Sequence, residues 1–567
     1  PPTVTEPDLP PTISFTVSNP SITVPNLTAP SVTLPDPPGT GNGDEMFIYD
    51  GKSAALAGIL SGWNVGVISQ YSTNGGTMDV DVLPSGGSSS FVALKSGTVI
   101  NSGLTSIKTN GVTFTGHLNP SHNGGSTYST NLNITNSSSL SAMKLIGGHR
   151  VDINNTQINF RGTGAGQKWL FHTDGHNDYG DSTWVIGNGS NINIDGTNLI
   201  MYTAQYHGGA PTAGNVGFVN NGNITTSATG NTNYIWATMA AGDYSITNKG
   251  RTMYFDNRAS GNITLNGTKD VFAVIDSETN LITPPNGPNG GFTVINDGKI
   301  NLAGKEQTGI TFGRDYPISE ILLNKPITIT GEKSTGIYFN HDIDLLGGQS
   351  RNKDTSNNVV TDISTSSTTT KKSILNVDIT AGKQNSGLFF DADGKTFDVA
   401  NSTVNLSSAD GSNAGIFVQN GTLNLNNSGN NNVNLIGGKD NVGIYVDNSG
   451  AGAGSKVATL NAEGKVNITG GTGGIGILSV GNPSTKVTAT NKGTVTVSAS
   501  DNTGMVAAVK GTVAGEINQE GTVLVNTTKA IGVAAKGAGS IANIKNGSKT
   551  TAGETTGKAG SAAGASG

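Results

Sequence analysis

Cysteine is absent from the 567-residue chain, and charged and aromatic residues are scarce, at 13% and 6% of the total. The absence of cysteine excludes a disulfide framework, a thiolate metal site and a cysteine nucleophile. The net charge of −6 argues against a nucleic-acid partner, because neutralising phosphates requires a basic face. No run approaches the roughly 18 apolar residues that a membrane-spanning helix needs.

Catalytic motifs are also missing. The chain has no Gly-x-Ser-x-Gly elbow, no His-Glu-x-x-His pair and no phosphate-binding loop. Gly180-Asp181-Ser182 is followed by Thr183-Trp184, where a serine-hydrolase elbow would need glycine. We therefore predict that the protein is not an enzyme, with a glycan-active hydrolase on the same scaffold as the less favoured alternative.

A box of a small residue, glycine and an apolar residue recurs through the second half. Its glycines are Gly309, Gly336, Gly387, Gly415, Gly443, Gly476, Gly504 and Gly532. Most neighbouring copies are 27 or 28 residues apart, and the interval of 51 between Gly336 and Gly387 contains an insertion. A fixed period of this length is typical of a solenoid.

Short strands are predicted within each period. Alternations such as Thr422-Leu423-Asn424-Leu425 are strand signals, and the Asn and Gly residues between them favour sharp turns. The chain is therefore predicted to be all-β: a right-handed parallel β-helix of about 28 residues per turn, with an elaborated, less regular β-rich N-terminal region. The right hand is expected because parallel crossovers almost always take it.

Composition and repeats divide the chain into five predicted segments. They are a Pro-rich extended leader (1–44), an irregular β-rich N-terminal region that is the candidate recognition end (45–210), a β-helix (211–344), a polar loop insertion (345–373) and a regular β-helix scaffold (374–567). Both ends of the chain lack the marks of a natural gene boundary, so we expect it to be a piece of a longer protein.

The leader contains 11 of the 20 prolines, and Pro20, Pro25, Pro30 and Pro35 recur every five residues. Proline forbids a helix and biases the preceding residue toward extended geometry. Two interpretations remain open for this segment: a stiff extended leader or tip strand, and an ordinary Pro-rich linker.

Aromatic residues are distributed unevenly. All four tryptophans precede residue 237, and no Phe, Tyr or Trp follows Asp447. Because binding hot spots favour aromatic residues, recognition is predicted in residues 45–260. The alternative is that these rings cap the end of the β-helix, which a solenoid requires.

The densest polar cluster, Phe171 to Trp184, and a second cluster around Tyr202 supply the candidate site. The predicted ligand-binding residues are Trp169, Asp174, His176, Asp178, Asp181, Trp184, Tyr202, Tyr206 and His207. Asp and an adjacent Trp suit a sugar, which takes hydrogen bonds and stacks on a ring. A solvated turn and simple cross-strand packing are the alternatives. The Ca²⁺-loop pattern lacks its terminal Glu, so no metal and no cofactor is predicted.

The leader from Thr12 to Pro35, the "TGIYF", "VGIYV" and "NKGTVTV" boxes and the cysteine-free composition resemble the N-terminal part of a type V autotransporter passenger. The resemblance is greatest to the large fusobacterial outer-membrane adhesins. It implies an exported virulence adhesin at the bacterial cell surface, anchored in the outer membrane by a C-terminal β-barrel that is not in this chain.

The same resemblance implies partners. These are host-cell glycans of the galactose or N-acetylgalactosamine type, protein receptors including immune-cell receptors, and other bacteria through coaggregation. A purely structural stalk that presents other domains is the alternative to an adhesin.

Overall fold

The computed structural model describes 26 segments of the chain. They are residues 22–33, 46–49, 68–82, 92–95, 98–99, 106–110, 113–118, 125–129, 133–134, 143–146, 150–162, 168–175, 182–206, 216–240, 252–275, 291–313, 319–341, 350–351, 363–364, 373–426, 430–447, 458–481, 487–510, 513–537, 539–545 and 549–552. Every regular element in them is a β-strand. These segments include no helix that is long and apolar enough to cross a membrane.

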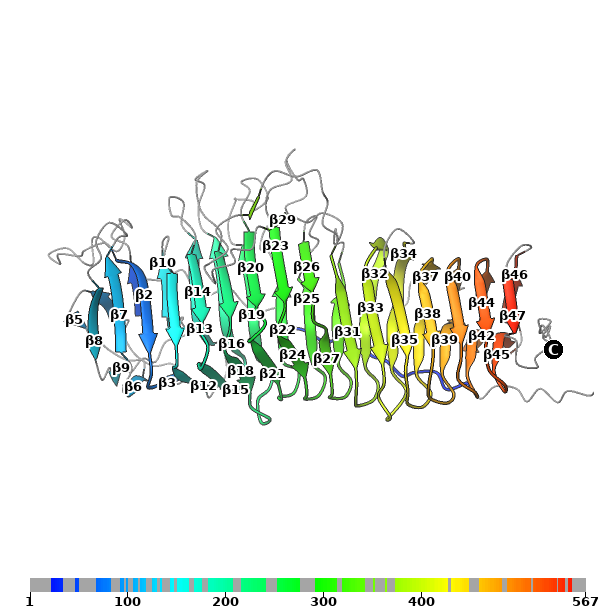
Figure 1. Cartoon of the computed structure of the whole chain (residues 1–567), viewed down its shortest axis with the longest axis horizontal. Helices are drawn as coiled ribbons and strands as arrows, with labels where there is room; N and C mark the ends of the chain where they lie inside the picture. Colours follow the sequence, from blue (N-terminus) through cyan, green and yellow to red (C-terminus); the bar gives the residue numbers. More distant parts are fainter. Residues whose placement is uncertain are drawn as a thin grey trace, which may run out of the picture.

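The strands stack into a long rod with three faces, which we name sheets A, B and C (Figure 1). The chain passes from sheet A to B to C and then returns to A one level further along. In the regular coils, each strand pairs in parallel with its counterparts in the coils before and after it. This is the predicted parallel β-helix, and its handedness stays a prediction.

The strand bounds follow the three faces. Sheet A contains β1 (Met46–Tyr49), β10 (Met143–Ile146), β13 (Lys168–Gly175), β16 (Leu199–Tyr206), β19 (Tyr234–Ala240), β22 (Val271–Ile275), β25 (Thr308–Phe312), β28 (Thr335–Phe339), β32 (Ser386–Val399), β34 (Ala414–Leu425), β36 (Val442–Asp447), β39 (Ile475–Gly481), β42 (Thr503–Lys510) and β45 (Ile531–Lys536). Sheet B contains β2 (Ile68–Asn74), β7 (Thr113–Leu118), β8 (Gly125–Ser129), β11 (Arg150–Asn154), β14 (Ser182–Ile186), β17 (Val216–Asn220), β20 (Thr252–Asn257), β23 (Gly291–Asn296) and β26 (Ser319–Leu323). Sheet C contains β3 (Thr77–Val82), β6 (Ser106–Asn110), β9 (Asn133–Ile134), β12 (Gln157–Gly162), β15 (Asn191–Gly196), β18 (Asn223–Thr226), β21 (Asn262–Leu265), β24 (Lys299–Leu302), β27 (Ile327–Ile329), β31 (Leu375–Ile379), β33 (Ser402–Leu406), β35 (Asn431–Leu435), β38 (Lys465–Ile468), β41 (Thr494–Val497), β44 (Thr522–Val525) and β47 (Lys549–Ala552).

Beyond the insertion, two long strands turn a corner. The C-terminal parts of β32 and β34 leave sheet A and begin a second column of strands. That column continues through β37 (Ala458–Ala462), β40 (Val487–Asn491), β43 (Val513–Gln519) and β46 (Ile541–Ile544). Of the predicted insertion, the described residues include β29 (Ser350–Arg351) and β30 (Ile363–Ser364), which pair antiparallel. The remainder, up to residue 372, lies outside the described residues.

The N-terminal end differs from the rest of the rod because antiparallel strands occur there. β2 pairs with β7, β7 with β8, and β3 with β6 in antiparallel register. β4 (Val92–Lys95) and β5 (Thr98–Val99) also pair antiparallel. Parallel stacking is already established between β10 and β13, so the regular coil begins before residue 211.

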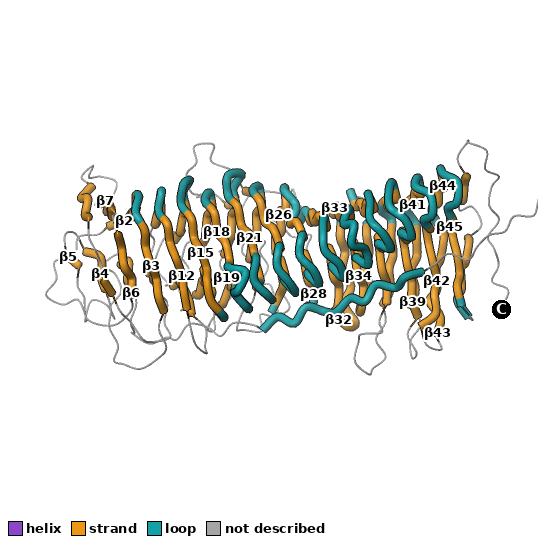
Figure 2. Tube along the Cα trace, turned by 90° about the horizontal axis from the view of Figure 1, so that it is seen from below, coloured by secondary structure: helices purple, strands orange, loops and turns teal. Residues whose placement is uncertain are grey.

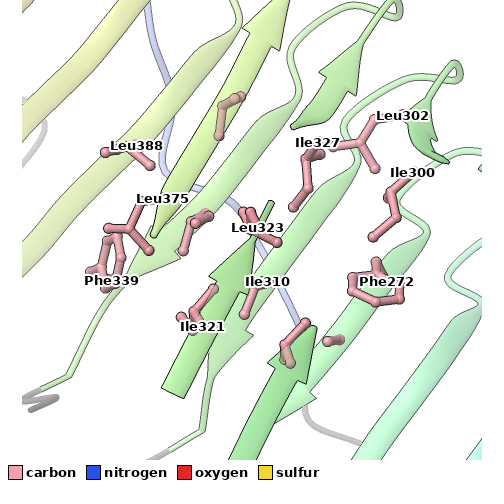
Figure 3. Packing of buried hydrophobic residues seen from close by; sticks show 14 of the residues in the cluster. Phe272, Ile300, Leu302, Ile310, Ile321, Leu323, Ile327, Phe339, Leu375 and Leu388 are labelled. Atoms are coloured by element: carbon pink, nitrogen blue, oxygen red, sulfur yellow. The ribbon is translucent and has the colours of Figure 1, made fainter. Parts of the chain in front are cut away.

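The coils are mostly longer in sequence in the first half than in the second, and we call them the wide and the narrow coils. Val271 pairs with Thr308, 37 residues further on, whereas Ser386 pairs with Ala414, 28 residues further on. The wide coils contain the large interior rings, including Trp184, Trp236 and Phe255. Aliphatic side chains from all three sheets fill the interior around Ile310 (Figure 3). Much of the early concentration of aromatics therefore belongs to the core of the rod.

The recurring glycine box forms a column on sheet A. A Cβ on Gly415 would lie 2.7 Å from the carbonyl oxygen of Gly443, and a Cβ on Gly443 would lie 2.6 Å from that of Gly476. The column is continuous from Gly309 to Gly504. Real Cβ atoms essentially never approach within 3.0 Å, so the backbone stacking of these coils requires glycine. The repeat seen in the sequence is thus the signature of a steric requirement.

A polar ladder lies at the corner between sheets C and A. The backbone N–H of Ser334 donates to Asn385 Oδ1 at 2.8 Å, that of Asn385 to Asn413 Oδ1 at 2.9 Å, and that of Asn413 to Asn441 Oδ1 at 3.2 Å. The same corner recurs in the other coils, and the residue directly before the ladder residue has a positive φ in many of them. These residues include Thr232, Lys269, Glu306, Lys333, Gln384, Ser412, Asp440 and Asp501. The buried amides satisfy backbone donors that a sharp corner would otherwise leave unpaired.

Residues 22–33 lie lengthwise on the outer face of sheet A, and we call this segment the strap (Figure 2). It forms no strand, and the Tyr234 hydroxyl on β19 donates to the Thr33 carbonyl at 2.6 Å. The segment runs along the rod, and both interpretations of the Pro-rich leader stay predictions. The remainder of the predicted leader, 1–21 and 34–44, lies outside the described residues.

Candidate functional site

Two of the predicted ligand-binding residues lie in the interior of the rod. Trp184 and Tyr202 are 0% exposed. The Trp184 indole donates to Thr173 Oγ1 at 3.0 Å, and the Tyr202 hydroxyl donates to the same oxygen at 3.4 Å. Trp184 also packs on Phe171 with ring centroids 4.7 Å apart. The prediction of a surface role is wrong for both residues, because β14 and β16 point their rings into the wide coils.

The other predicted residues divide into two groups. Trp169 is 4% exposed and packs on the outer side of sheet A, beside Val32 of the strap, so its ring does not offer a free face. Asp174 on β13 and Tyr206 on β16 are described by their backbones alone. His176, Asp178, Asp181 and His207 lie outside the described residues. Their role in binding stays a prediction.

An open polar hollow of about 290 Å³ lies instead on the outer side of sheet C. It is lined by Asn159, Arg161, Asn193, Ile194, Asp195, Thr225, Thr226 and Ser227. Three successive strands, β12, β15 and β18, supply these residues except Ser227, which directly follows β18. Parallel register places Arg161 directly beside Asp195. Alternation turns the polar members outward, while Ile194 and Thr226 are buried beneath them.

Hydrogen bonds hold the walls of the hollow. Asn193 Nδ2 donates to Asn159 Oδ1 at 3.2 Å, and the Ser227 hydroxyl donates to Asp195 Oδ1 at 2.6 Å. The hollow presents a guanidinium, a carboxylate, amides and hydroxyls on rigid strands. This set offers donors and acceptors of both kinds, which suits a ligand rich in hydroxyl groups.

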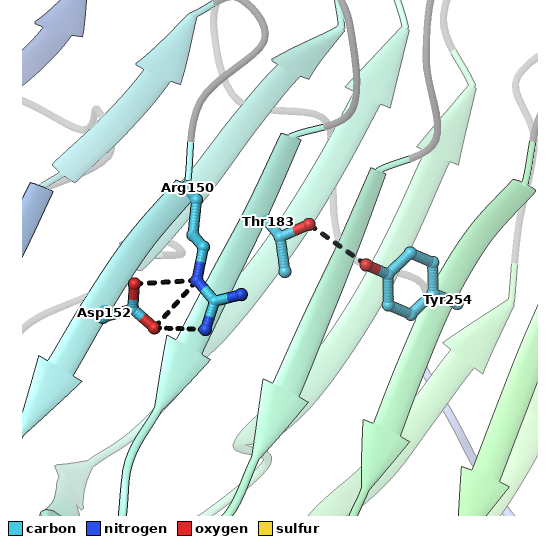
Figure 4. A network of polar contacts seen from close by, with 4 residues as sticks. All are labelled: Arg150, Asp152, Thr183 and Tyr254. Carbon is cyan, nitrogen blue, oxygen red and sulfur yellow. Dashed lines mark hydrogen bonds and ion pairs between the residues drawn. The ribbon is translucent and has the colours of Figure 1, made fainter. Parts of the chain in front are cut away.

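Sheet B has two polar pairs in the same coils, and their contacts are drawn in Figure 4. Arg150 and Asp152 form an ion pair at 2.7 Å. Tyr254 lies over Gly217 and bonds to Thr183 at 3.0 Å. Asp152, Thr183 and Tyr254 are all buried. Each pair satisfies its own members, and Arg150 is part-exposed, with 26% of its side chain accessible, so we assign these groups to the packing of sheet B.

One buried carboxylate interrupts the ladder of amides. Asp270 accepts hydrogen bonds from the Thr226 hydroxyl at 2.6 Å and from the N–H groups of Asn233 and Gly267 at 2.9 and 3.0 Å. Burial raises its pKa above the ordinary range, although these hydrogen bonds lower it. Burial, followed by the charge of Asp270, also raises the pKa of Tyr234 to about 12. Asp270 is enclosed and takes no part in the hollow.

The described segments contain no group of three or more acidic or histidine side chains that could hold a metal ion. The hollow has one carboxylate, Asp195, and its oxygen is engaged by Ser227. Comparison with protein-family models, with curated proteins and with solved structures finds no match. The parallel β-helix therefore defines the class of the fold, and function has to be argued from the surface.

The sequence contains a signal for the hollow that the prediction did not use. The segments Gln157-Ile-Asn-Phe-Arg161 and Asn191-Ile-Asn-Ile-Asp195 alternate polar and apolar residues in the same phase. In a parallel coil, segments in the same phase stack their polar positions. The wide coils have no glycine box, so their register could not be read from the repeat.

Proposed function

We propose that this chain is an adhesive rod at a bacterial cell surface and that the hollow on sheet C contacts hydroxyl-rich groups of host-cell glycans. The observation that carries this proposal is the hollow itself, which Arg161, Asp195 and two amides line on neighbouring strands. A sugar can accept from the guanidinium and the amides, and it can donate to carboxylate and hydroxyl oxygens.

The resemblance to autotransporter adhesins supports the same function. The resemblance implies an exported protein, and stacking between neighbouring coils would give it stability without cysteine. Under this proposal, galactose or N-acetylgalactosamine is the first ligand to test. Protein receptors, immune-cell receptors and other bacteria are further partners that the resemblance suggests.

The test measures binding of the full chain to host cells with and without free galactose or N-acetylgalactosamine. Arg161→Ala and Asp195→Asn are compared with Lys465→Ala and Asp378→Asn, which change a cation and a carboxylate on the narrow part of sheet C. Asp378 is a close match for Asp195, since it also accepts a side-chain hydrogen bond, from Asn405 at 2.7 Å. Losing one charge-assisted hydrogen bond should weaken binding about tenfold or more.

Sugar-sensitive binding that falls in the hollow variants and persists in the controls would support the proposal. Binding that resists free sugar and survives all four changes would move recognition to a protein receptor elsewhere on the chain. Complete absence of binding would favour the structural stalk. The regularity of the narrow coils, where one amide ladder runs from Asn385 to Asn441, is the observation that favours this second function.

A further inference from the structure

The outer face of sheet A carries an apolar stripe along the rod. Tyr338, Phe389, Phe417 and Tyr445 stand in one register column, and their rings pack at centroid distances of 5.3, 4.5 and 4.8 Å. Leu478 and Val506 continue the column on β39 and β42. We call this column the outer stripe. These residues point away from the interior, because their neighbours in sequence, such as Leu388, belong to the core.

The strap covers this stripe. Ile22, Val24, Leu27 and Ala29 pack against the cluster that contains the outer stripe, and Val32 packs on a second cluster beside Tyr234. The strap therefore runs opposite to the direction in which the coils are added (Figure 2). Its five contacting residues are spaced 2, 3, 2 and 3 apart. The average spacing lies between the two-residue repeat of a strand and the three-residue repeat of polyproline II. It keeps one face of an extended chain on the stripe.

The lengths of strap and stripe agree. Twelve extended residues at about 3.1–3.3 Å each span about 37–40 Å. The eight steps from β19 to β42 cover about 38 Å at about 4.8 Å per coil. Asn26, Thr28 and Ser31 face outward and are exposed, so the pentad repeat is amphipathic. Pro25 is buried, and aromatic surfaces are the usual receptors for extended proline-containing segments.

We propose that the outer stripe is a binding site for an extended, proline-punctuated apolar peptide, which the chain fills with its own residues 22–33. In a solenoid each coil contacts only its neighbours. The strap packs on one cluster with members from β13 to β22 and on another with members from β28 to β42, so it joins the wide and narrow halves into one cooperative unit. The segment is replaceable, since it is held by side chains and the Tyr234 hydroxyl rather than by a strand ladder.

The first experiment uses the full chain with a protease site inserted within residues 39–43. After cleavage, the N-terminal fragment should remain with the rod on size exclusion. An excess of a synthetic peptide of residues 20–35 should displace it. A control peptide with Ser at positions 24, 27 and 32 should need at least tenfold higher concentration. Separation of the fragment without competitor, equal effects of the two peptides, or no displacement by either would overturn the proposal. If the uncleaved protein is a dimer that the peptide dissociates, the strap of one copy occupies the outer stripe of the other. That result would overturn the assignment of the strap to its own chain.

The second experiment tests cooperativity with Leu27→Asp and its matched control, Thr28→Asp. Leu27 faces the outer stripe, whereas its neighbour Thr28 is exposed. Tryptophan fluorescence reports the first half of the rod, since every tryptophan precedes residue 237, and far-UV circular dichroism reports all strands. The two urea transitions should coincide in the parent and in Thr28→Asp and separate in Leu27→Asp. Coincident transitions in Leu27→Asp would overturn the coupling role.

Discussion

Replacing Gly443 by alanine tests the steric origin of the repeat. The added Cβ would lie 2.6 Å from the carbonyl oxygen of Gly476 and 3.0 Å from Leu435 Cδ1. The carbonyl sits between hydrogen-bonded residues of β36 and β39, so it can move only by opening that ladder. Overpacking of this kind costs about 1–3 kcal/mol, and a weakened ladder bond adds about 1 kcal/mol. We expect Gly443→Ala to lower the free energy of unfolding by about 2–4 kcal/mol.

Gly437→Ala is the matched control. Its Cβ would meet only the Ser407 carbonyl, at an ordinary 3.8 Å, and its φ lies outside the left-handed region. Restricting the unfolded chain should make this change neutral or stabilising by about 0.4–1 kcal/mol. Urea unfolding followed by far-UV circular dichroism compares the two variants. If they differ by less than about 0.5 kcal/mol, the glycine column is not a steric requirement, and the reasoning fails.

Two further predictions concern buried groups. Trp184→Ala should cost about 3–5 kcal/mol in urea unfolding, because it empties part of a wide coil; a cost below about 1 kcal/mol would instead indicate an exposed ring. Burial raises the folded-state pKa of Asp270, so the stability it contributes is complete below about pH 4, its unfolded pKa, and is lost as pH rises through the folded pKa. The stability of the parent relative to Asp270→Asn should therefore fall with rising pH in urea midpoints, and a constant difference would contradict this account.

The narrow half of the fold could be predicted because one steric rule repeats in every coil. Where Gly309 begins the column, the period becomes visible in the sequence. In the wide coils the matching positions hold interior side chains such as Ile235 and Phe272, and coil lengths vary, so no fixed period marks them. A coil can be recognised in the sequence when close backbone contact allows only glycine at one position. It is much harder to recognise when several side chains can fill the same interior space.

The candidate site was harder to predict for a related reason. β14 is buried along its whole length, so periodicity cannot say which side of it faces the interior. The sequence therefore predicts Trp184 at the surface, although its ring lies in the interior of the rod. The hollow depends on Arg161 and Asp195 becoming neighbours, although they are 34 residues apart and register alone joins them. Composition carries no information about that register.

The strap also constrains the order of folding. Ile22 packs against a cluster to which Val506 and Ala508 belong, so the strap joins coils that lie far from it in the sequence. Contacts of such sequence separation form late, since loop-closure entropy must be overcome first. Residues 22–33 can complete their docking only after the coils through β42 exist. The strap can therefore dock fully only on a rod that has formed its coils through β42. A chain stalled at an earlier coil keeps residues 22–33 and part of the outer stripe uncovered.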